Sequence, residues 1–340
     1  MKKGASRPPG PRRVTMQEVG RIAGVSQVTV SRALSDPSKV SPETLAKIMG
    51  AVEATGFVPN AIAGALASRK SRLVSALVPS ITNVVYSSMV RAFSERLRDH
   101  GYQILLSETG FDPEDEEATV VAHLSRRPDA IMLTGIQHSP QVRRLLLAAG
   151  IPVVELWDVS DSPIDLCVGF HHVDAARAAA EFAIDRGYTH AATVTAGDER
   201  ARRRQGGFAE RFGRNSAVPV PDYDAGGPAS IAAGREGFAA LLAANDLRGG
   251  VIYCSSDILA HGVLIEARSH GLTIPGDIAV IGFGDQEFAR HLDPALTTVR
   301  IDLPKLGQAA ADAVLSRING QTVASPVIDL RFDIIARASA

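Results

Sequence analysis

Short apolar runs alternate with amphipathic stretches from Leu73 to the end of the chain. Seven runs of mainly β-branched and aliphatic residues are predicted as strands: LVSALVPS (73–80), YQILLSE (102–108), DAIMLTG (129–135), IPVVELWD (151–158), HAATVTA (190–196), GGVIYCSS (249–256) and IAVIGFG (278–284). The stretches between them predict helices near 86–100, 114–126, 140–149, 174–186, 202–212, 230–244 and 258–270. This alternation predicts an α/β core of two doubly wound lobes, with a ligand cleft between them.

The N-terminal part of the chain predicts three short helices, each from its own start signal. Thr15, followed three residues later by a glutamate, has the spacing of a capping box. Ser26 is the expected N-cap of the second helix, and Ser41 opens the third with a proline and a glutamate in its first turn. The first helix is expected to end at Gly24 and the third near Gly56. The third helix is expected to bury Leu45, Ile48, Met49 and Val52.

The first two of these helices, joined by the short turn Gly24-Val25-Ser26, predict an all-α helix-turn-helix head. The second helix of this motif enters the major groove of DNA. On its outward face Arg32 has the fork geometry for guanine, Gln27 could pair with adenine, and Val28 could contact a thymine methyl. The hydroxyls expected to bind phosphate are those of Thr15, Ser26, Thr29 and Ser31.

The charges along the chain support a polyanionic partner for the head alone. Residues 1–72 carry twelve Lys and Arg and four Asp and Glu, a net charge of +8. The remaining residues carry 24 basic and 33 acidic side chains, a net charge of −9, so the whole-chain value of −1 conceals a strong asymmetry.

Composition excludes several other classes of protein. Residues 1–13 read as a disordered basic arm without the apolar segment of a secretory signal, and no apolar run reaches the ~18 residues that span a bilayer. Cys167 and Cys254 suggest no disulfide framework. We therefore expect a cytoplasmic protein with no membrane partner. Its expected parts are an arm (1–13), a helix-turn-helix domain (14–59), a hinge (60–71) and a two-lobed effector-binding and dimerisation domain (72–340).

The expected hinge begins at Asn60, which caps the segment AIAGALAS. This segment is too short to be a stable helix alone in water. A helix that forms only when two copies meet on DNA would be a switchable element. A plain linker is the alternative, and the residues alone leave both possibilities open.

The head and hinge resemble the lactose-repressor (LacI/GalR) family of transcriptional repressors. The resemblance rests on VTMQEVGRIAGVSQVTVSRALS and VSPETLAKIMGAVEATGFVPNAIAGAL, which include the Ala-Gly-Val-Ser turn, the Thr-Val-Ser-Arg run and Pro-Asn-x-x-Ala-x-x-Leu. It implies that Leu66 wedges open a base step from the minor groove, beside the hinge residues Asn60 and Ala63. Gly20 departs from the alanine usual in the family, at a cost of ~1 kcal/mol of helix propensity. The core is similar to the family's periplasmic-binding-protein-like domain, so the resemblance covers nearly the whole chain.

The resemblance also implies an effector site at the strand ends. Arg204, three residues before Gly207-Phe208, falls on the family's effector-binding arginine, whereas Arg202 and Arg203 are expected at the surface. Ser256-Asp257 stands where sugar repressors often have Asn-Asp. The expected effector-binding residues are Ser80, Trp157, Asp158, Phe170, His171, Arg204, Ser256, Asp257 and Asp285, with His172 as a secondary candidate. Trp157 could be a core aromatic or a wall of the pocket.

The expected effector is a sugar acid. Gly284-Asp285 stands where many neutral-sugar members have two acids, and a missing carboxylate beside a retained arginine suits an anionic ligand. Gly284 could instead serve a tight turn. The stretches GIPVVELWDVSDSPIDLCVGF, DERARRRQGGF and IGFGD look most like the gluconate-operon repressor branch of the family, which implies gluconate or a related acid such as 2-ketogluconate. A phosphorylated sugar acid would draw further basic residues into the cleft.

Catalysis is not indicated by the sequence. The chain has no G-x-x-x-x-G-K-[ST], G-x-S-x-G or G-x-G-x-x-G motif, and the pair His171-His172 would point to opposite faces of a strand. We therefore predict no enzyme, no cofactor and no metal site, but a homodimeric repressor that binds near-palindromic operator DNA and is released by its effector. The alternatives are a regulator that responds to a neutral sugar, a sugar-binding protein that does not bind DNA, and a sugar-acid enzyme with an added head.

Overall fold

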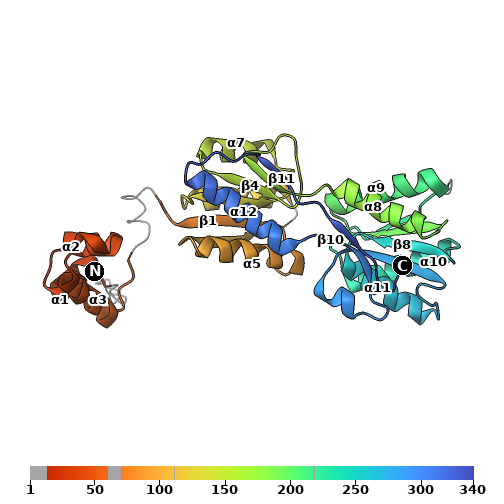
Figure 1. Cartoon of the computed structure of the whole chain (residues 1–340), viewed down its shortest axis with the longest axis horizontal. Coiled ribbons are helices and arrows are strands. Elements are labelled where there is room, and N and C mark those ends of the chain that lie inside the picture. Colours follow the sequence, from red (N-terminus) through yellow and green to blue (C-terminus); the bar gives the residue numbers. More distant parts are fainter. Residues whose placement is uncertain (1–13, 60–69, 111, 217–218) are drawn as a thin grey trace, which may run out of the picture. The chain divides into compact units, whose positions relative to one another are not determined.

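A computed structural model describes residues 14–59, 70–110, 112–216 and 219–340 of the chain. The chain divides into two compact units, residues 1–71 and 72–340, which we call the head and the core (Figure 1). The predicted arm and the hinge residues Asn60, Ala63 and Leu66 lie outside the described residues. None of the helices in the described ranges combines the length and the apolarity that crossing a membrane requires.

The head is all-helical, as the start signals predict. Its elements are α1 (Met16–Ala23), α2 (Gln27–Ser35), the 3-10 helix η1 (Pro37–Lys39) and α3 (Pro42–Thr55). The side chains of Thr15, Ser26 and Ser41 each accept a hydrogen bond from the backbone N–H three residues further on. Gly24 and Gly56 end α1 and α3 in the left-handed conformation, with φ of 68° and 62°.

The small core of the head is formed by one face of each helix. Its buried apolar residues are Val19, Ala23, Val30, Ala33, Ile48, Ala51 and Phe57. Met49, which was expected to be buried on α3, is 49 % exposed, whereas Ala51 is buried. The reason is rotation along the helix, because Ala51 lies three residues after Ile48 and shares its face, whereas Met49 is turned about 100° away.

Gly20 allows the turn between α1 and α2 to pack directly against α1. A Cβ atom at this position would lie 2.7 Å from the carbonyl oxygen of Val25, and Gly20 is buried. The glycine therefore does more than weaken the helix, because the close approach of the turn depends on the missing side chain.

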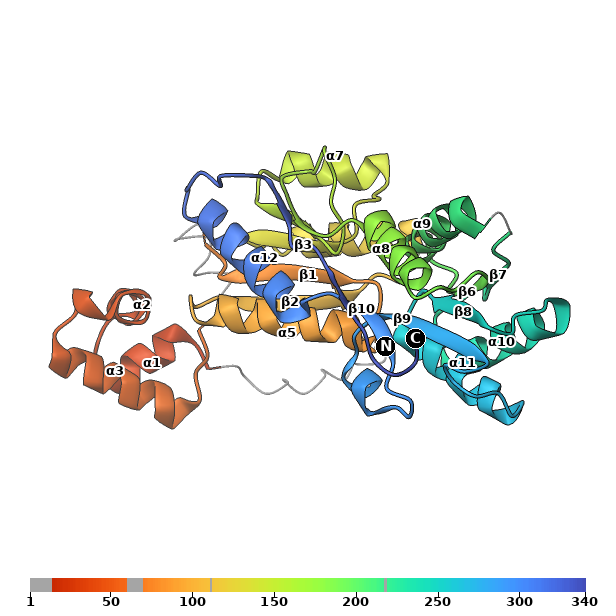
Figure 2. The ribbon, with the colours of Figure 1, turned by 45° about the vertical axis from the view of Figure 1, so that its right-hand side comes forward.

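The core consists of two lobes, each built on a six-stranded and mainly parallel sheet (Figures 1 and 2). In lobe 1 the strand order is β11-β5-β4-β3-β1-β2. Its elements are β1 (Leu73–Val78), α5 (Val84–Arg98), β2 (Gln103–Glu108), α6 (Pro113–Leu124), β3 (Ala130–Thr134), α7 (Pro140–Ala149), β4 (Val153–Leu156), β5 (Leu166–Gly169), α12 (Leu303–Ile318) and β11 (Val327–Asp329).

In lobe 2 the strand order is β12-β10-β9-β8-β6-β7, and only the β10–β12 pair is antiparallel. Its elements are α8 (His172–Asp185), β6 (Ala191–Thr195), α9 (Glu199–Ser216), β7 (Asp222–Asp224), α10 (Ile231–Ala244), β8 (Gly250–Cys254), α11 (Asp257–Ser269), β9 (Ile278–Gly284), the 3-10 helix η2 (Glu287–His291), β10 (Thr297–Arg300) and β12 (Asp333–Ile335).

The inner strands of each sheet are buried on both faces, so they are almost continuously apolar, whereas the edge strands β2, β7, β11 and β12 are partly exposed. In β3, for example, Ile131 and Leu133 belong to the apolar cluster shared with α6 and α7, whereas Ala130 and Met132 belong to the cluster shared with α5 and α12. This alternation follows from the two-residue period of a strand. The predicted doubly wound α/β class is therefore confirmed.

Five strands and one helix of the core were not predicted from the apolar pattern. The strands β5, β7, β10, β11 and β12 have only three or four residues each. Helix α12 did carry local signals, because Asp302 caps it, Pro304 lies in its first turn, and Leu306 and Ala310 share its buried side.

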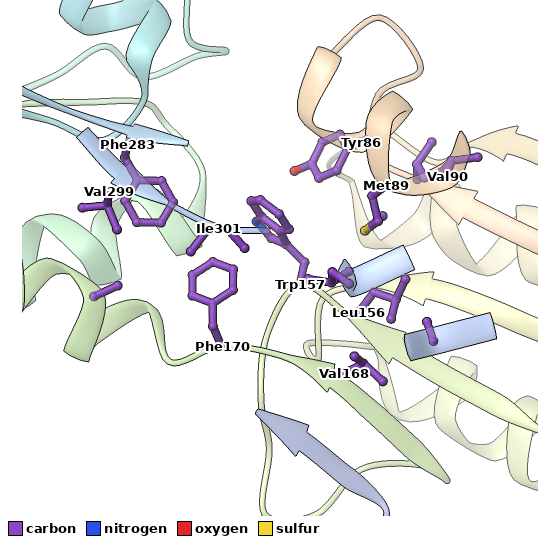
Figure 3. Packing of buried hydrophobic residues seen from close by; sticks show 14 of the residues in the cluster. Tyr86, Met89, Val90, Leu156, Trp157, Val168, Phe170, Phe283, Val299 and Ile301 are labelled. Carbon is purple, nitrogen blue, oxygen red and sulfur yellow. The ribbon is translucent and has the colours of Figure 1, made fainter. Parts of the chain in front are cut away.

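The chain passes between the lobes three times: after β5, after β10 and after β11. A continuous cluster of buried apolar residues accompanies these crossings. Figure 3 shows part of it, with Trp157 between Tyr86 and Phe170, and with Phe283 and Ile301 contributed by the other lobe. Connections of this kind allow two lobes to close by hinge motion.

Candidate functional site

A cavity of about 650 Å³ lies between the two lobes of the core. Its walls come from residues that follow the carboxyl ends of β1, β2 and β4 in lobe 1 and of β6, β8 and β9 in lobe 2. This is where parallel sheets gather ligand-binding side chains. The polar side chains on the wall include Ser80, Asn83, Glu108, Asp198, Ser256 and Gln286.

The structure brings four of the nine expected effector residues to this cavity. They are Ser80, Trp157, Arg204 and Ser256. The other five, namely Asp158, Phe170, His171, Asp257 and Asp285, do not line it.

Arg204 is a buried cation on the wall of the cavity. Its Nη1 donates to Nδ1 of His172 at 2.9 Å, its Nη2 donates to the Ser255 carbonyl at 3.0 Å, and its Nε has no hydrogen-bond partner. The guanidinium carbon lies 4.4 Å from the centre of the Phe283 ring. Among the described residues no carboxylate forms an ion pair with Arg204, and burial lowers the pKa of its side chain. An arginine remains charged even so, and it therefore offers a ligand unused donors and a positive charge that no ion pair neutralises.

His172 contacts Arg204, is fully buried and does not line the cavity. Its Nε2 hydrogen-bonds to the Trp157 carbonyl at 2.8 Å. Burial, and then the positive charge of Arg204, hold the pKa of His172 well below its ordinary value, so the imidazole is neutral.

Trp157 is both a core aromatic and a wall residue, so the two roles left open by the sequence coexist. It is 5 % exposed, it lines the cavity, and its ring makes edge contacts with Tyr86 and Phe170 at centroid distances of 6.2 and 5.2 Å. Its backbone φ of 77° is unusual for a residue with a side chain. The hydrogen bond from His172 holds the carbonyl of this strained residue.

Arg200 is a second cation on the wall, and the sequence interpretation missed it. It precedes Arg204 by one helical turn on α9, and its Nη2 donates to the Tyr86 hydroxyl at 3.1 Å across the two lobes. A Cβ atom on Gly135 would lie 3.1 Å from this guanidinium. The four-residue spacing from Arg204 was a signal in the sequence, because residues four apart share a helix face.

Asp158 and Arg203 correct two expectations. Arg203, expected at the surface, donates to both carboxylate oxygens of Asp158 at 2.6 and 3.2 Å. Asp158 is 1 % exposed and also accepts from the Val159 N–H. Its carboxylate is therefore engaged by the protein rather than directed at the cavity. Arg202 lies at the surface and pairs with Asp224.

Asp257 and Asp285 are also engaged within the protein. Asp257 is buried and accepts from the Thr298 hydroxyl and from the Gln286 N–H, at 2.5 and 2.7 Å, and burial raises its pKa to about 6. Asp285 pairs with Arg337 at 2.6 Å. Both carboxylates therefore have partners within the protein and do not line the cavity.

Gly284 does line the cavity, with a φ of 127°. This conformation strongly favours glycine. Glycine at position 284 therefore accounts both for the backbone conformation and for the missing carboxylate.

The remaining two expected residues are separated from the cavity by their positions in the fold. Phe170 is fully buried and packs 4.4 Å from the ring of His172. His171 is exposed and precedes α8, where its side chain makes no capping hydrogen bond. The buried member of the histidine pair is therefore His172.

The head presents the outward face of α2 to solvent. Gln27, Val28 and Arg32 are exposed, with Val28 at 59 %, whereas Val30 and Ala33 are buried against the other helices. This exposed face is the one that the second helix of a helix-turn-helix presents to the major groove.

The hydroxyls expected at phosphates also cap helices. Thr15 accepts from the Glu18 N–H, Ser26 accepts from the Thr29 N–H, and the hydroxyls of Ser26 and Thr29 lie 2.9 Å apart. Ser31 is exposed on α2. A capping hydroxyl that accepts from the backbone keeps its own proton for another acceptor.

Comparisons with known proteins agree with this architecture. The family description "Bacterial regulatory proteins, lacI family" matches residues 15–60, and "Periplasmic binding protein-like domain" matches residues 180–340. The HTH-type transcriptional regulator GntR of Pseudomonas aeruginosa is 35 % identical over 334 residues, which cover 96 % of each chain.

Two solved structures are similar over almost the whole chain. A LacI-family transcriptional regulator from Silicibacter pomeroyi has a TM-score of 0.90 at 34 % identity and covers 96 % of this chain and 99 % of its own. The lac repressor dimer bound to operator and the anti-inducer ONPF has a TM-score of 0.84 at 27 % identity, with the same coverage.

These matches define the class as DNA-binding transcriptional regulators with a helix-turn-helix head and a two-lobed core. The chain belongs to the LacI family of bacterial regulatory proteins. The predicted resemblance is thereby confirmed.

Proposed function

We propose that this regulator represses genes of sugar-acid catabolism and is released from its operator when a sugar acid binds between the lobes of the core. The observation that carries the proposal is Arg204, a buried cation on the cavity wall with no ion-pairing carboxylate among the described residues. A ligand carboxylate would supply the missing charge and accept from the unused guanidinium donors.

The rest of the wall suits a polyhydroxylated acid. Side chains able to bind hydroxyl groups, such as Ser80, Asn83 and Gln286, come from both lobes. The cavity of about 650 Å³ is in the range that holds a small organic ligand. These features support a site for gluconate or 2-ketogluconate, and the name of the similar Pseudomonas aeruginosa regulator is in keeping with this proposal.

The charges on the wall favour a singly charged acid over a phosphorylated one. Arg200 is a further basic residue on this wall, and one of its N–H groups donates to the Tyr86 hydroxyl. Glu108 and Asp198 add two carboxylates to the same wall. These carboxylates equal the wall cations Arg200 and Arg204 in number, so the additional charge of a phosphate would be balanced less well than the single charge of a sugar acid.

Release of DNA would follow from closure of the lobes. A ligand held by both lobes favours the arrangement in which its contacts are complete, and it shifts the equilibrium by its difference in affinity for the two arrangements. We propose that, in a homodimer, the closed arrangement melts the segment from Asn60 to Ser68, so that Leu66 leaves the minor groove. The two heads then bind a near-palindromic operator more weakly. We propose a regulatory role without catalysis, since the similar proteins are transcriptional regulators.

Fluorescence of Trp157 tests the effector assignment, because it is the sole tryptophan and lies on the cavity wall. The full-length protein would be titrated with gluconate, 2-ketogluconate, 6-phosphogluconate and glucose, with calorimetry for each ligand that changes the signal. Saturable binding of gluconate or 2-ketogluconate, with release of an operator duplex in a gel-shift assay, is the expected result. Tight binding of glucose without a response to the acids would overturn the sugar-acid assignment.

Arg204→Ala supplies the matched variant. It should bind the operator as the wild type does and fail to release it in the presence of the acid. Arg202→Ala, which removes an exposed arginine two residues away, should respond normally. A normal response of the Arg204→Ala protein would exclude this arginine as the carboxylate partner.

A further inference from the structure

We infer that His172 is a positioning residue that gives the cavity its preference for acids, because it orients Arg204 through a neutral acceptor and leaves the charge of the guanidinium free. This inference rests on the proposed sugar-acid site. It concerns the residue that hydrogen-bonds to Arg204 rather than the arginine itself.

The hydrogen bonds of His172 define its protonation. The Trp157 carbonyl can only accept, so Nε2 of His172 at 2.8 Å must carry a proton and donate. Nη1 of Arg204 can only donate, so Nδ1 of His172 at 2.9 Å must present its lone pair. Only the neutral imidazole with its proton on Nε2 satisfies both partners.

The surroundings of His172 keep it in this form. Arg200 and Arg203, as well as Arg204, face it with positive charge, and it packs against the rings of Phe170 and Phe283. Among the described residues, the carboxylate oxygen within 4.0 Å of Nε2 is Oδ2 of Asp158, and this carboxylate is already paired with Arg203. Burial and these cations together disfavour an imidazolium.

These hydrogen bonds fix the orientation of Arg204 and do not neutralise its positive charge. Both of its hydrogen-bond partners, the imidazole of His172 and the carbonyl of Ser255, are uncharged, and the ring of Phe283 lies beneath it. A buried arginine is more often paired with a carboxylate. A carboxylate at position 172 would form that pair, and the anionic ligand would then compete with a built-in anion.

The same hydrogen-bond chain crosses between the lobes. Arg204 and His172 belong to lobe 2, whereas the Trp157 carbonyl belongs to lobe 1. His172 therefore fixes the position of Arg204 relative to Trp157 on the opposite wall of the cavity, where the carbon chain of a ligand would lie.

Two nearly isosteric variants separate charge from shape. His172→Gln retains a donor and an acceptor in one neutral group, whereas His172→Glu replaces the neutral acceptor by an anion. His171→Gln is the matched control, because this neighbouring histidine is exposed and does not line the cavity. For each full-length protein, calorimetry would give the Kd for gluconate, for 2-ketogluconate and for the neutral polyol sorbitol, and a gel-shift assay would report operator binding.

We expect His172→Gln to retain most of the wild-type preference for acid over sorbitol, and His171→Gln to have the same preference as the wild type. His172→Glu should lower this preference by about tenfold or more, mainly through weaker acid binding. A His172→Glu protein that binds the operator and keeps the wild-type preference would overturn the inference.

If His172→Glu fails to bind the operator or to melt cooperatively, His172→Phe decides the question. It keeps a buried ring but offers Arg204 no acceptor, so the acid preference should again fall; an unchanged preference would overturn the inference. A wild-type protein that binds neither acid would instead contradict the proposed function. The two failures are therefore distinguished by the wild-type titration.

Discussion

Arg203 donates to both carboxylate oxygens of Asp158 and so joins helix α9 of lobe 2 to the residue that follows β4 in lobe 1. The side chain of Asp158 is 1 % exposed and that of Arg203 is 28 % exposed, so the pair is largely removed from solvent. A buried carboxylate that loses its cation is left uncompensated, which costs far more than the loss of a surface pair.

Arg203→Ala should therefore destabilise the core by about 2–3 kcal/mol. Denaturant unfolding followed by circular dichroism measures this change. Arg202→Ala is the control, because it removes an adjacent exposed arginine that pairs with Asp224 at the surface, and its effect should be clearly smaller. Equal losses in the two variants would show that the Arg203–Asp158 contact adds no more than a surface pair.

His138 predicts a pH dependence of stability in the alkaline range. Its Nδ1 lies 2.9 Å from a carboxylate oxygen of Glu116, its Nε2 lies 3.2 Å from the Gly135 carbonyl, and the Glu155 carboxylate is 3.5 Å from the same nitrogen. Burial alone would lower the pKa of His138, but the hydrogen bonds and charges of Glu116 and Glu155 outweigh it and raise the pKa to about 9. Both ring nitrogens thus face acceptors, as the protonated ring requires.

Because the folded-state pKa of His138 exceeds its ordinary value of 6.5, the folded protein binds the proton more tightly than the unfolded chain. The stabilisation is complete below about pH 6.5 and is lost as the pH rises through about 9. We expect the wild type to lose about 1–3 kcal/mol more than His138→Gln between these pH values. Urea unfolding at pH 6 and pH 9 measures the difference. His291→Gln, which alters an exposed histidine, should behave as the wild type, and parallel pH profiles of wild type and His138→Gln would refute the assignment.

Gly20 and Gly50 predict a difference between two glycine-to-alanine changes in the head. Both glycines lie within helices, so either change gains about 0.5–1 kcal/mol of helix propensity. Gly50 has open space around its Cβ position, whereas a Cβ on Gly20 would lie 2.7 Å from the Val25 carbonyl oxygen. Gly50→Ala should therefore stabilise the head by most of this amount, and Gly20→Ala should stabilise it less or destabilise it. Hydrogen exchange of the α1 and α3 amides in the full-length protein compares them, and equal gains would contradict the close approach at Gly20.

Arg32 predicts a loss of sequence discrimination in DNA binding. It is exposed on α2 beside Gln27 and Val28. Arg32→Ala should lower the preference for the best operator over single-base variants by about 1–3 kcal/mol and leave weaker, salt-sensitive binding. Arg21→Ala removes an exposed arginine from α1 instead and should change binding by a similar factor for all sequences. Selection from a randomised duplex library, followed by titrations, measures both effects. Discrimination by Arg32→Ala equal to that of the wild type would remove the base-reading role.

The sequence by itself determined the helices of the head, because their signals are local. The caps at Thr15, Ser26 and Ser41 and the terminating Gly24 and Gly56 act within one helical turn. The longer strands of the core were equally readable, since a strand buried on both faces is a continuous apolar run. The three-residue strands β7, β11 and β12 had no such signal, because strands this short exist only through pairing with a neighbour.

Only the tertiary structure shows which groups each of several similar side chains contacts. Consecutive residues on a helix point about 100° apart, so the run Arg202-Arg203-Arg204 sends one side chain to a surface carboxylate, one to buried Asp158 and one to the cavity. The same holds for His171 and His172, of which only His172 hydrogen-bonds to Arg204. The family resemblance indicated Arg204, and the sequence placed a histidine pair beside a strand end. Their roles depend on which groups the other lobe brings into contact with them, and these contacts join residues far apart in the sequence.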